Sequence, residues 1–272
     1  TEIQNSNASA WHLLGVSHLN SGNNEQAVRY LEHAFSVDPK HADIAYQLAY
    51  SYYRSNRPED AKNTISIARL QHPRHYALGK LSVQIALDEH HWEVARQITH
   101  QFMGHQSEDG DLWYFIALVL FHRGRTAAAK RFAHRAIRLC PNHHLAYLLL
   151  AHIALACVEV DGVRWAISRF LTTSPNRGLA SIHAALVLAE CGDLDRASQY
   201  AEFGLASNSE SSEAWRVLGR VRQLQGQLDE AQALTQISLS KVDLPSEDSL
   251  RQLAWTLRGQ GLLTEACAVF IR

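Results

Sequence analysis

Residues 8–41 read ASAWHLLGVSHLNSGNNEQAVRYLEHAFSVDPKH, and their pattern of apolar and small residues indicates the fold. Its first half places residues at the i, i+3, i+4, i+7 spacing of one buried helical face: Trp11, Leu14, Gly15 and His18. Residues 20–24 break that pattern, and a second helical run follows over residues 27–34. Pro39 then stands where a proline prevents further helix. The stretch therefore predicts two helices joined by a short turn.

The same pattern returns every 34 residues, so the 272 residues span eight periods. One position in each first helix holds only small or β-branched residues: Gly15, Ala49, Val83, Ala117, Ala151, Ala185 and Gly219. A matching position in each second helix does the same: Ala27, Ala61, Ala95, Ala129, Val163, Ala197 and Ala231. Small side chains let two helix axes approach closely. The sequence thus predicts an all-α protein of about eight helix-turn-helix repeats.

The residues that end helices and form the turns between them also recur with this period. Four repeats close on a proline: Pro39, Pro73, Pro141 and Pro175. Five carry glycine at the turn between their two helices, where a positive φ is often required: Gly22, Gly124, Gly192, Gly226 and Gly261. Pro58 suits the first turn of a second helix. No strand-type alternation competes with this reading.

The predicted repeats follow a lead-in of residues 1–7. They cover 8–41, 42–75, 76–109, 110–143, 144–177, 178–211, 212–246 and 247–272. The last repeat needs one inserted residue and stops inside its second helix. A solenoid normally completes and caps its terminal repeat. We therefore expect the chain to be an excised part of a longer protein.

Composition narrows the function further. Lys plus Arg number 26 and Asp plus Glu number 27, so the overall charge gives no argument for nucleic acid or an anionic membrane. Hydrophobic residues make up 46% of the chain, which is enough for a large core. No apolar stretch approaches the roughly 20 residues of a membrane-spanning helix. We find no nucleophile elbow, phosphate loop or dinucleotide fingerprint, and we expect no catalysis by this segment and no cofactor.

The repeat resembles the tetratricopeptide repeat (TPR) family across about residues 8–272. The resemblance lies in these sets: Trp11, Leu14, Gly15, Ala27 and Pro39; Leu48, Ala49, Tyr52, Ala61, Ala68 and Pro73; Trp113, Ala117, Ala129, Ala136 and Pro141; Trp215, Leu218, Gly219 and Ala231. It implies a right-handed α-solenoid, or superhelix, whose concave wall is made by the first helix of each repeat. It also implies a protein-protein interaction scaffold.

By that resemblance, fixed positions of each first helix face a groove with three zones. The aromatic zone holds Tyr46, Tyr50, Tyr53, Tyr114 and Phe115. The middle zone holds Leu148, His152, Ile182 and Leu186. The last zone holds Arg216, Arg220, Arg251 and Trp255. We expect the groove to capture a peptide or amphipathic helix of another protein with an acidic end, because arginine pairs well with carboxylates. The alternative is that part of the Leu/Ile set packs between adjacent first helices.

Two specialisations of TPR proteins are not supported. The carboxylate clamp of chaperone-binding adaptors requires Lys and Asn at fixed groove positions, and the first repeat offers His12 and Val16 there. The asparagine ladder of TPR-bearing sugar transferases is replaced by residues such as Leu13 and Gln47.

A second candidate surface is the basic set Lys130, Arg131, Arg135 and Arg138. It would suit an acidic protein, a lipid headgroup or nucleic acid, although a solvated convex helix face is the favoured interpretation.

An acidic sixth repeat leaves self-association open. The 16 histidines show no spacing typical of a metal site, and we expect none. Cys157 and Cys191 are expected to be buried thiols too far apart for a disulfide. They favour a reducing, cytoplasmic compartment, with a periplasmic location left open for an exported parent protein.

We therefore expect a non-catalytic scaffold that binds a partner in its groove. The alternative is a substrate-docking or assembly arm of a larger bacterial enzyme or of a secretion or exopolysaccharide-export protein. The sequence does not identify the partner.

Overall fold

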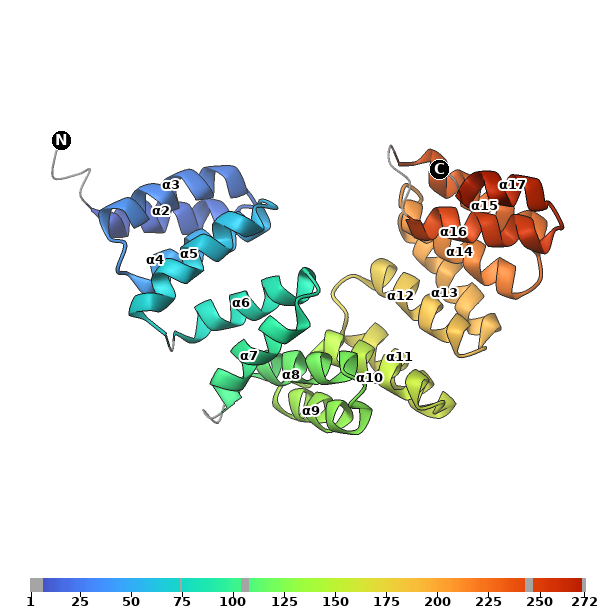
Figure 1. Ribbon diagram of the computed structural model, residues 1–272, viewed down its shortest axis with the longest axis horizontal. Helices are drawn as coiled ribbons and strands as arrows, with labels where there is room; N and C mark the ends of the chain where they lie inside the picture. The colour runs from blue at the N-terminus through green and yellow to red at the C-terminus, as the bar shows by residue number, and fades with distance from the viewer. Residues whose placement is uncertain (1–6, 74, 104–107, 243–246, 271–272) are drawn as a thin grey trace. The chain divides into compact units, whose positions relative to one another are not determined.

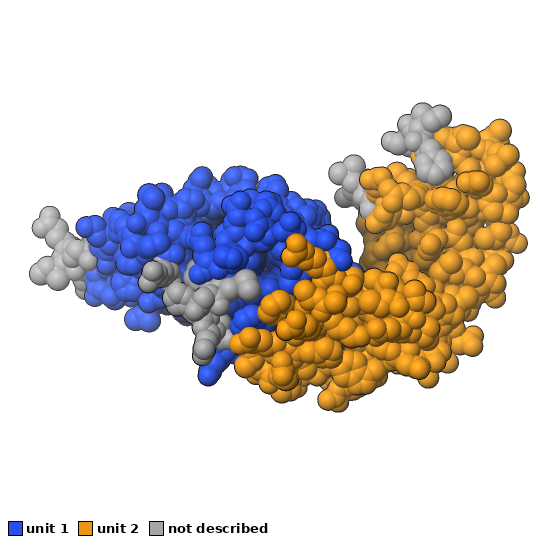
Figure 2. Space-filling view, turned by 60° about the horizontal axis from the view of Figure 1, so that its bottom comes forward, with its two compact units in different colours: residues 1–124 blue, residues 125–272 orange. Residues whose placement is uncertain are grey.

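The computed structural model describes residues 7–73, 75–103, 108–242 and 247–270. Every regular element within these ranges is an α-helix (Figure 1), which confirms the predicted fold class. Of the predicted lead-in, residues 1–6 lie outside the described residues. The helices form two compact units, residues 1–124 and 125–272 (Figure 2). The division falls between the two helices of the predicted repeat 110–143, where the sequence pattern continues without change.

Unit 1 alternates the predicted first and second helices of each repeat. Its helices are α2 (Ala8–Asn20), α3 (Asn24–Val37), α4 (Ala42–Arg54), α5 (Pro58–Gln71), α6 (Tyr76–Asp88), α7 (Trp92–Met103) and α8 (Gly110–His122). Unit 2 continues with α9 (Thr126–Leu139), α10 (His144–Ala156), α11 (Val160–Thr173), α12 (Arg177–Glu190), α13 (Leu194–Ser207), α14 (Ser212–Leu224), α15 (Leu228–Ser240), α16 (Glu247–Gly259) and α17 (Leu263–Phe270).

The small residues lie where the two helices of a repeat cross. Ala61, Ala129 and Ala197 are fully buried, and so is Val163 at the same repeat position. Gly15 in α2 faces Leu31 in α3 so closely that a Cβ on the glycine would lie 2.5 Å from Leu31 Cγ. The size restriction read from the sequence therefore reflects the close approach of helix axes.

The turns and helix ends follow the same repeat. Pro58 is the first residue of α5, and α3 ends at Val37, two residues before Pro39. The turn position has a positive φ in every repeat, for example 78° at Gly22. Where the repeat lacks glycine, Asn56, His90 and Val158 adopt φ values of 58°, 58° and 60°. The backbone conformation is thus imposed by the repeat, even on residues that disfavour it.

First and second helices lie on different faces of each unit. Successive first helices contact one another, namely α2, α4, α6 and α8 in unit 1 and α10, α12, α14 and α16 in unit 2. Successive second helices such as α5 and α7 lie further apart and meet through side chains: Arg69 of α5 donates to Gln101 of α7 at 2.7 Å. We call the face formed by the first helices the inner face of a unit, and that formed by the second helices its outer face.

Candidate functional site

The inner face of unit 2 is hollowed across α12, α14 and α16. The hollow has a volume of about 640 Å³ and is lined by Leu186, Glu190, Arg216, Arg220, Asp248, Arg251, Gln252 and Trp255. Five of the residues that the sequence predicts for the groove therefore meet here: Leu186, Arg216, Arg220, Arg251 and Trp255. They come from three successive repeats, because the frame of 34 residues places equivalent positions of neighbouring first helices side by side. We call this the inner hollow.

Two of its three arginines are already paired with carboxylates of their own helices. The Arg216 guanidinium lies 2.5 Å from the Glu213 carboxylate, which raises the pKa of Arg216. Arg251 lies 2.5 Å from Glu247 and 3.4 Å from Asp248. These contacts neutralise much of the positive charge that the sequence suggests for this zone.

Arg220 differs from both neighbours. Its guanidinium donates a hydrogen bond to Gln223 Oε1 at 3.0 Å, and within the described ranges no carboxylate lies within ion-pair distance of it. An arginine paired only with a neutral amide retains its charge for a ligand, and a carboxylate satisfies its donors best. Arg220 is therefore the cation of the inner hollow best suited to hold an acidic group.

The wall beside these arginines is partly apolar. The Trp255 side chain is 51% exposed, and the Arg258 guanidinium lies 5.2 Å from its ring centroid. Leu186 is half-buried on α12. At the floor, buried Gln252 donates to the backbone oxygen of Arg216 at 3.0 Å and to Thr235 Oγ1 at 3.2 Å. An exposed indole beside a satisfied polar floor is a surface that can accept an apolar side chain.

The remaining residues predicted for the middle zone are divided. Leu148 and His152 are half-buried on α10. Ile182 is only 2% exposed and packs inside unit 2, beneath Gly204 of α13. Ile182 therefore belongs to the core and offers no surface to a partner. This packing against the second helix of the same repeat differs from the alternative for the Leu/Ile set, which was packing between adjacent first helices.

The tyrosines that the sequence predicts for the groove lie on first helices of unit 1, three on α4 and one on α8. The rings of Tyr46 and Tyr50 stack with centroids 6.1 Å apart, and Tyr53 donates from its hydroxyl to Asp88 at 2.5 Å. Burial, and then the nearby Asp88 carboxylate, raises the pKa of Tyr114 to about 12. Phe115, in contrast, is 5% exposed and lies in the core, so it cannot serve as a surface anchor without rearrangement.

A lysine among these tyrosines is neutralised. Lys80 pairs with Asp111 and, at 3.3 Å, with Asp109. Its donors are thereby occupied across α6 and α8. The inner face of unit 1 presents aromatic rings and hydroxyl groups, with the exposed Arg54 guanidinium beside the Tyr50 hydroxyl.

The basic set on α9 is smaller than the sequence suggests. Lys130 lies 2.6 Å from the Glu159 carboxylate and is paired with it. Arg131, Arg135 and Arg138 are exposed, which is consistent with the solvated face favoured by the sequence. Three exposed arginines on one helix are a weak basis for binding nucleic acid, because affinity grows with the number of phosphates neutralised.

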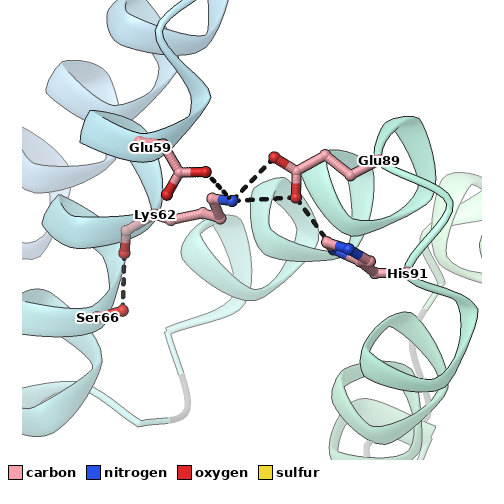
Figure 3. Close-up of polar contacts among 5 residues, drawn as sticks. All are labelled: Glu59, Lys62, Ser66, Glu89 and His91. Atoms are coloured by element: carbon pink, nitrogen blue, oxygen red, sulfur yellow. Dashed lines mark hydrogen bonds and ion pairs between the residues drawn. The ribbon is translucent and has the colours of Figure 1, made fainter.

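The outer face of unit 1 also has a hollow, of about 300 Å³, between α5 and α7 over α6. Lys62 stands at its edge and bridges two acids, with Glu59 at 2.6 Å and Glu89 at 2.9 Å (Figure 3). Glu89 also contacts His91 Nδ1 at 3.2 Å. Because these charges satisfy one another, this cluster ties α5 to the end of α6 and leaves no charge unpaired for a ligand.

Two cysteine predictions are wrong. Cys157 is exposed and Cys191 is half-buried. Both follow the last residue of a first helix, at the turn, where side chains point out of the core. These two thiols therefore do not indicate a reducing compartment.

Comparisons with known proteins agree with the fold. Three segments match models of the tetratricopeptide repeat family: residues 18–81, 110–153 and 183–239. Protein FlbA of Caulobacter vibrioides is 28% identical over 153 residues, which are 56% of this chain and 26% of that protein. The chain thus spans about a quarter of the length of this relative.

Solved structures resemble the chain at low sequence identity. A tetratricopeptide repeat protein from Parabacteroides merdae has a TM-score of 0.73 at 13% identity, over 92% of this chain and 98% of that one. For Pseudomonas aeruginosa pilF the TM-score is 0.64 at 20% identity, over 81% and 97%. For yeast Tom70 it is 0.65 at 18% identity, over 97% and 59%. These likenesses show a shared fold. Within the described ranges, none of the helices combines the length and apolar content needed to cross a bilayer.

Proposed function

Because the chain belongs to the tetratricopeptide repeat family, we propose that it is a non-catalytic protein-interaction array whose inner hollow holds a segment of a partner protein. The fold is typical of protein-protein interaction. The observation that supports this proposal is the meeting of Leu186, Arg220 and Trp255 in one hollow from three successive repeats. Sites that combine an apolar wall with a few polar groups are the usual form of a binding site.

The hollow favours a partner segment with two features. An apolar side chain would cover the exposed Trp255 indole beside Leu186, since removing apolar surface from water drives association. A carboxylate would pair with Arg220. Of the three arginines in the hollow, Arg220 is the one that has no ion pair with a carboxylate in the described part of the chain. Arg216 and Arg251 would act less directly, because each would have to exchange an existing carboxylate for a new one.

A pull-down with the chain as bait tests the proposal. Trp255→Ala combined with Arg220→Glu removes the indole and reverses the charge at two positions outside the core. Proteins recovered by the wild type and lost with this double variant would be ligands of the inner hollow. Trp165→Ala is the matched control, because this tryptophan is 47% exposed on α11, a second helix of the same unit. Recovery of the same proteins by the folded double variant would refute the proposal.

The inner face of unit 1 is a further contact surface in this proposal. Tyr46, Tyr50 and Tyr53 on α4 and Tyr114 on α8 offer rings with polar tips, a combination common at protein interfaces. Tyr50→Ala tests this contact surface in the same pull-down. Tyr50 is half-buried, and its hydroxyl accepts a hydrogen bond from Arg54 Nη1 at 3.3 Å.

The match to FlbA favours a second candidate, in which the array is the docking or assembly arm of a longer protein. The supporting observation is that the chain corresponds to about a quarter of that relative. The intact mass of the endogenous protein, captured with an antibody against the array, tests this idea. A mass well above 30.5 kDa would support it, and a mass near that value would contradict it.

A further inference from the structure

The outer face of unit 2 contains a second hollow, of about 470 Å³, between α11 and α13 with α12 as its floor. We call it the outer hollow. Its lining residues are Ser168, Leu171, Thr172, Arg177, Ser181, Gln199, Tyr200 and Phe203. The volume falls within the range of about 300–1,000 Å³ typical of ligand sites.

The cause of this hollow lies in the repeat. Both adjacent repeats carry an aromatic residue at the position of Ser181, namely Tyr147 and Trp215. The first and fourth repeats hold Trp11 and Trp113 there, while the second and third hold Ala45 and Gly79. In the preceding repeat the Tyr147 ring packs 5.9 Å from the ring of Trp165, and its hydroxyl donates to the Pro141 carbonyl oxygen at 3.1 Å. Ser181 instead donates to the carbonyl oxygen of Arg177 at 2.8 Å, within its own helix. A missing aromatic side chain thus leaves space between the helices.

The rest of the lining is apolar with few open polar groups. Phe203 is 50% exposed beside Tyr200 and Leu171. The hydroxyls of Ser168 and Thr172 donate to carbonyl oxygens of α11 at 2.7 and 2.9 Å, so they do not compete for a ligand. An exposed aromatic ring at the edge of a cavity is typical of a binding surface.

The edge of the outer hollow carries one cation. Arg177 is exposed at the start of α12, and in the described part of the chain no acid lies within ion-pair distance of it. None of the lining residues is acidic. A carboxylate is the group that complements a solvent-accessible guanidinium in such a place.

We propose that the outer hollow docks a partner polypeptide through an aromatic side chain that takes the place of the missing repeat aromatic, with an adjacent carboxylate paired with Arg177. This surface lies between the second helices α11 and α13 with α12 as its floor, and it shares no lining residue with the inner hollow. It gives the array a second docking point for a segment in which an acidic and an aromatic residue are neighbours.

Synthetic peptides provide the probe. A Gly/Ser peptide with Asp-Trp at its centre is compared with matched Asp-Ala and Lys-Trp peptides by NMR titration of the whole chain. We expect the Asp-Trp peptide to shift the ring signals of Tyr200 and Phe203 and to bind about tenfold or more tightly than either control. Equal binding of the three peptides, shifts confined to other residues, or no saturation at millimolar peptide would overturn the proposal.

Variants of the chain distinguish binding in the outer hollow from non-specific binding of the peptide. Ser181→Trp supplies the aromatic from within the chain and should weaken Asp-Trp binding about tenfold or more. Phe203→Ala changes an exposed residue and should do the same if Ser181→Trp fails to fold. Arg177→Glu should abolish the preference for Asp over Lys. Trp165→Ala, an aromatic of similar exposure outside the hollow, should leave the peptide-induced shifts of Tyr200 and Phe203 unchanged. Equal losses in all variants would contradict the proposal.

Discussion

Gly15 in α2 and Leu31 in α3 approach so closely that a Cβ on the glycine would lie 2.5 Å from Leu31 Cγ. Leu31 is fully buried, so it has little room to move away. The contact fixes the crossing of the first helix pair, and it explains why this repeat position excludes large residues.

Gly15→Ala should therefore destabilise unit 1. We expect a loss of about 1–3 kcal/mol from overpacking, partly offset by about 1 kcal/mol of improved helix propensity. Urea unfolding of the variant measures the difference. Adding Leu31→Ala to Gly15→Ala should cost less than the sum of the two single changes, because the cavity accepts the new methyl group. Strict additivity would contradict this account.

Val158 should be a stabilising site for glycine. It is a β-branched residue at φ 60°, and its side chain is 83% exposed. The left-handed backbone conformation therefore costs free energy that burial of the side chain does not offset. Val158→Gly should raise the free energy of unfolding by about 1 kcal/mol. Asn56→Gly is the matched control at φ 58° and should gain less, since asparagine tolerates this region. A destabilised Val158→Gly variant would refute the strain argument.

Ser82 should accept a larger side chain. It lines the hollow between α5 and α7, while equivalent positions hold buried Leu48, Ile116 and Leu150. Ser82→Leu should stabilise unit 1 by about 1–2 kcal/mol through added apolar burial. Ser82→Ala removes the hydroxyl without filling the space and should show little gain. Thermal unfolding of both variants checks this, and a lower midpoint for Ser82→Leu than for Ser82→Ala would show that the hollow cannot take the side chain.

The raised pKa of Tyr114 predicts that the protein loses stability at high pH. In the unfolded chain a tyrosine loses its proton near pH 10, whereas burial raises the pKa of folded Tyr114 to about 12. Between these values the folded state binds more protons, so stability falls as the pH rises. Tyr114→Phe should make the decline in the free energy of unfolding between pH 10 and pH 12 less steep. An unchanged slope in Tyr114→Phe would show that Tyr114 does not contribute.

Much of the fold could be predicted from the sequence. The helix pairs, their turns and the close contacts at Ala61 or Gly15 follow from residue size and spacing, which are local properties repeated along the chain. The same frame placed Leu186, Arg220 and Trp255 at equivalent positions of three successive repeats, and they meet in the inner hollow. Periodicity alone suffices for this, because each repeat packs only on its neighbours.

Which of these residues remain available to a partner depends on the tertiary structure. Phe115 and Ile182 stand beside Tyr114 and His183 in sequence, yet the rotation of about 100° per helical residue turns them into the core. The pairing of Arg216 with Glu213 depends on how side chains meet in space. So does the position of Arg220, which in the described part of the chain bonds to Gln223 and forms no ion pair. The sequence shows that Ser181 replaces an aromatic residue. Whether the space of that missing ring stays open depends on how α11 and α13 pack around Ser181. A void persists only where no neighbouring side chain can reach it.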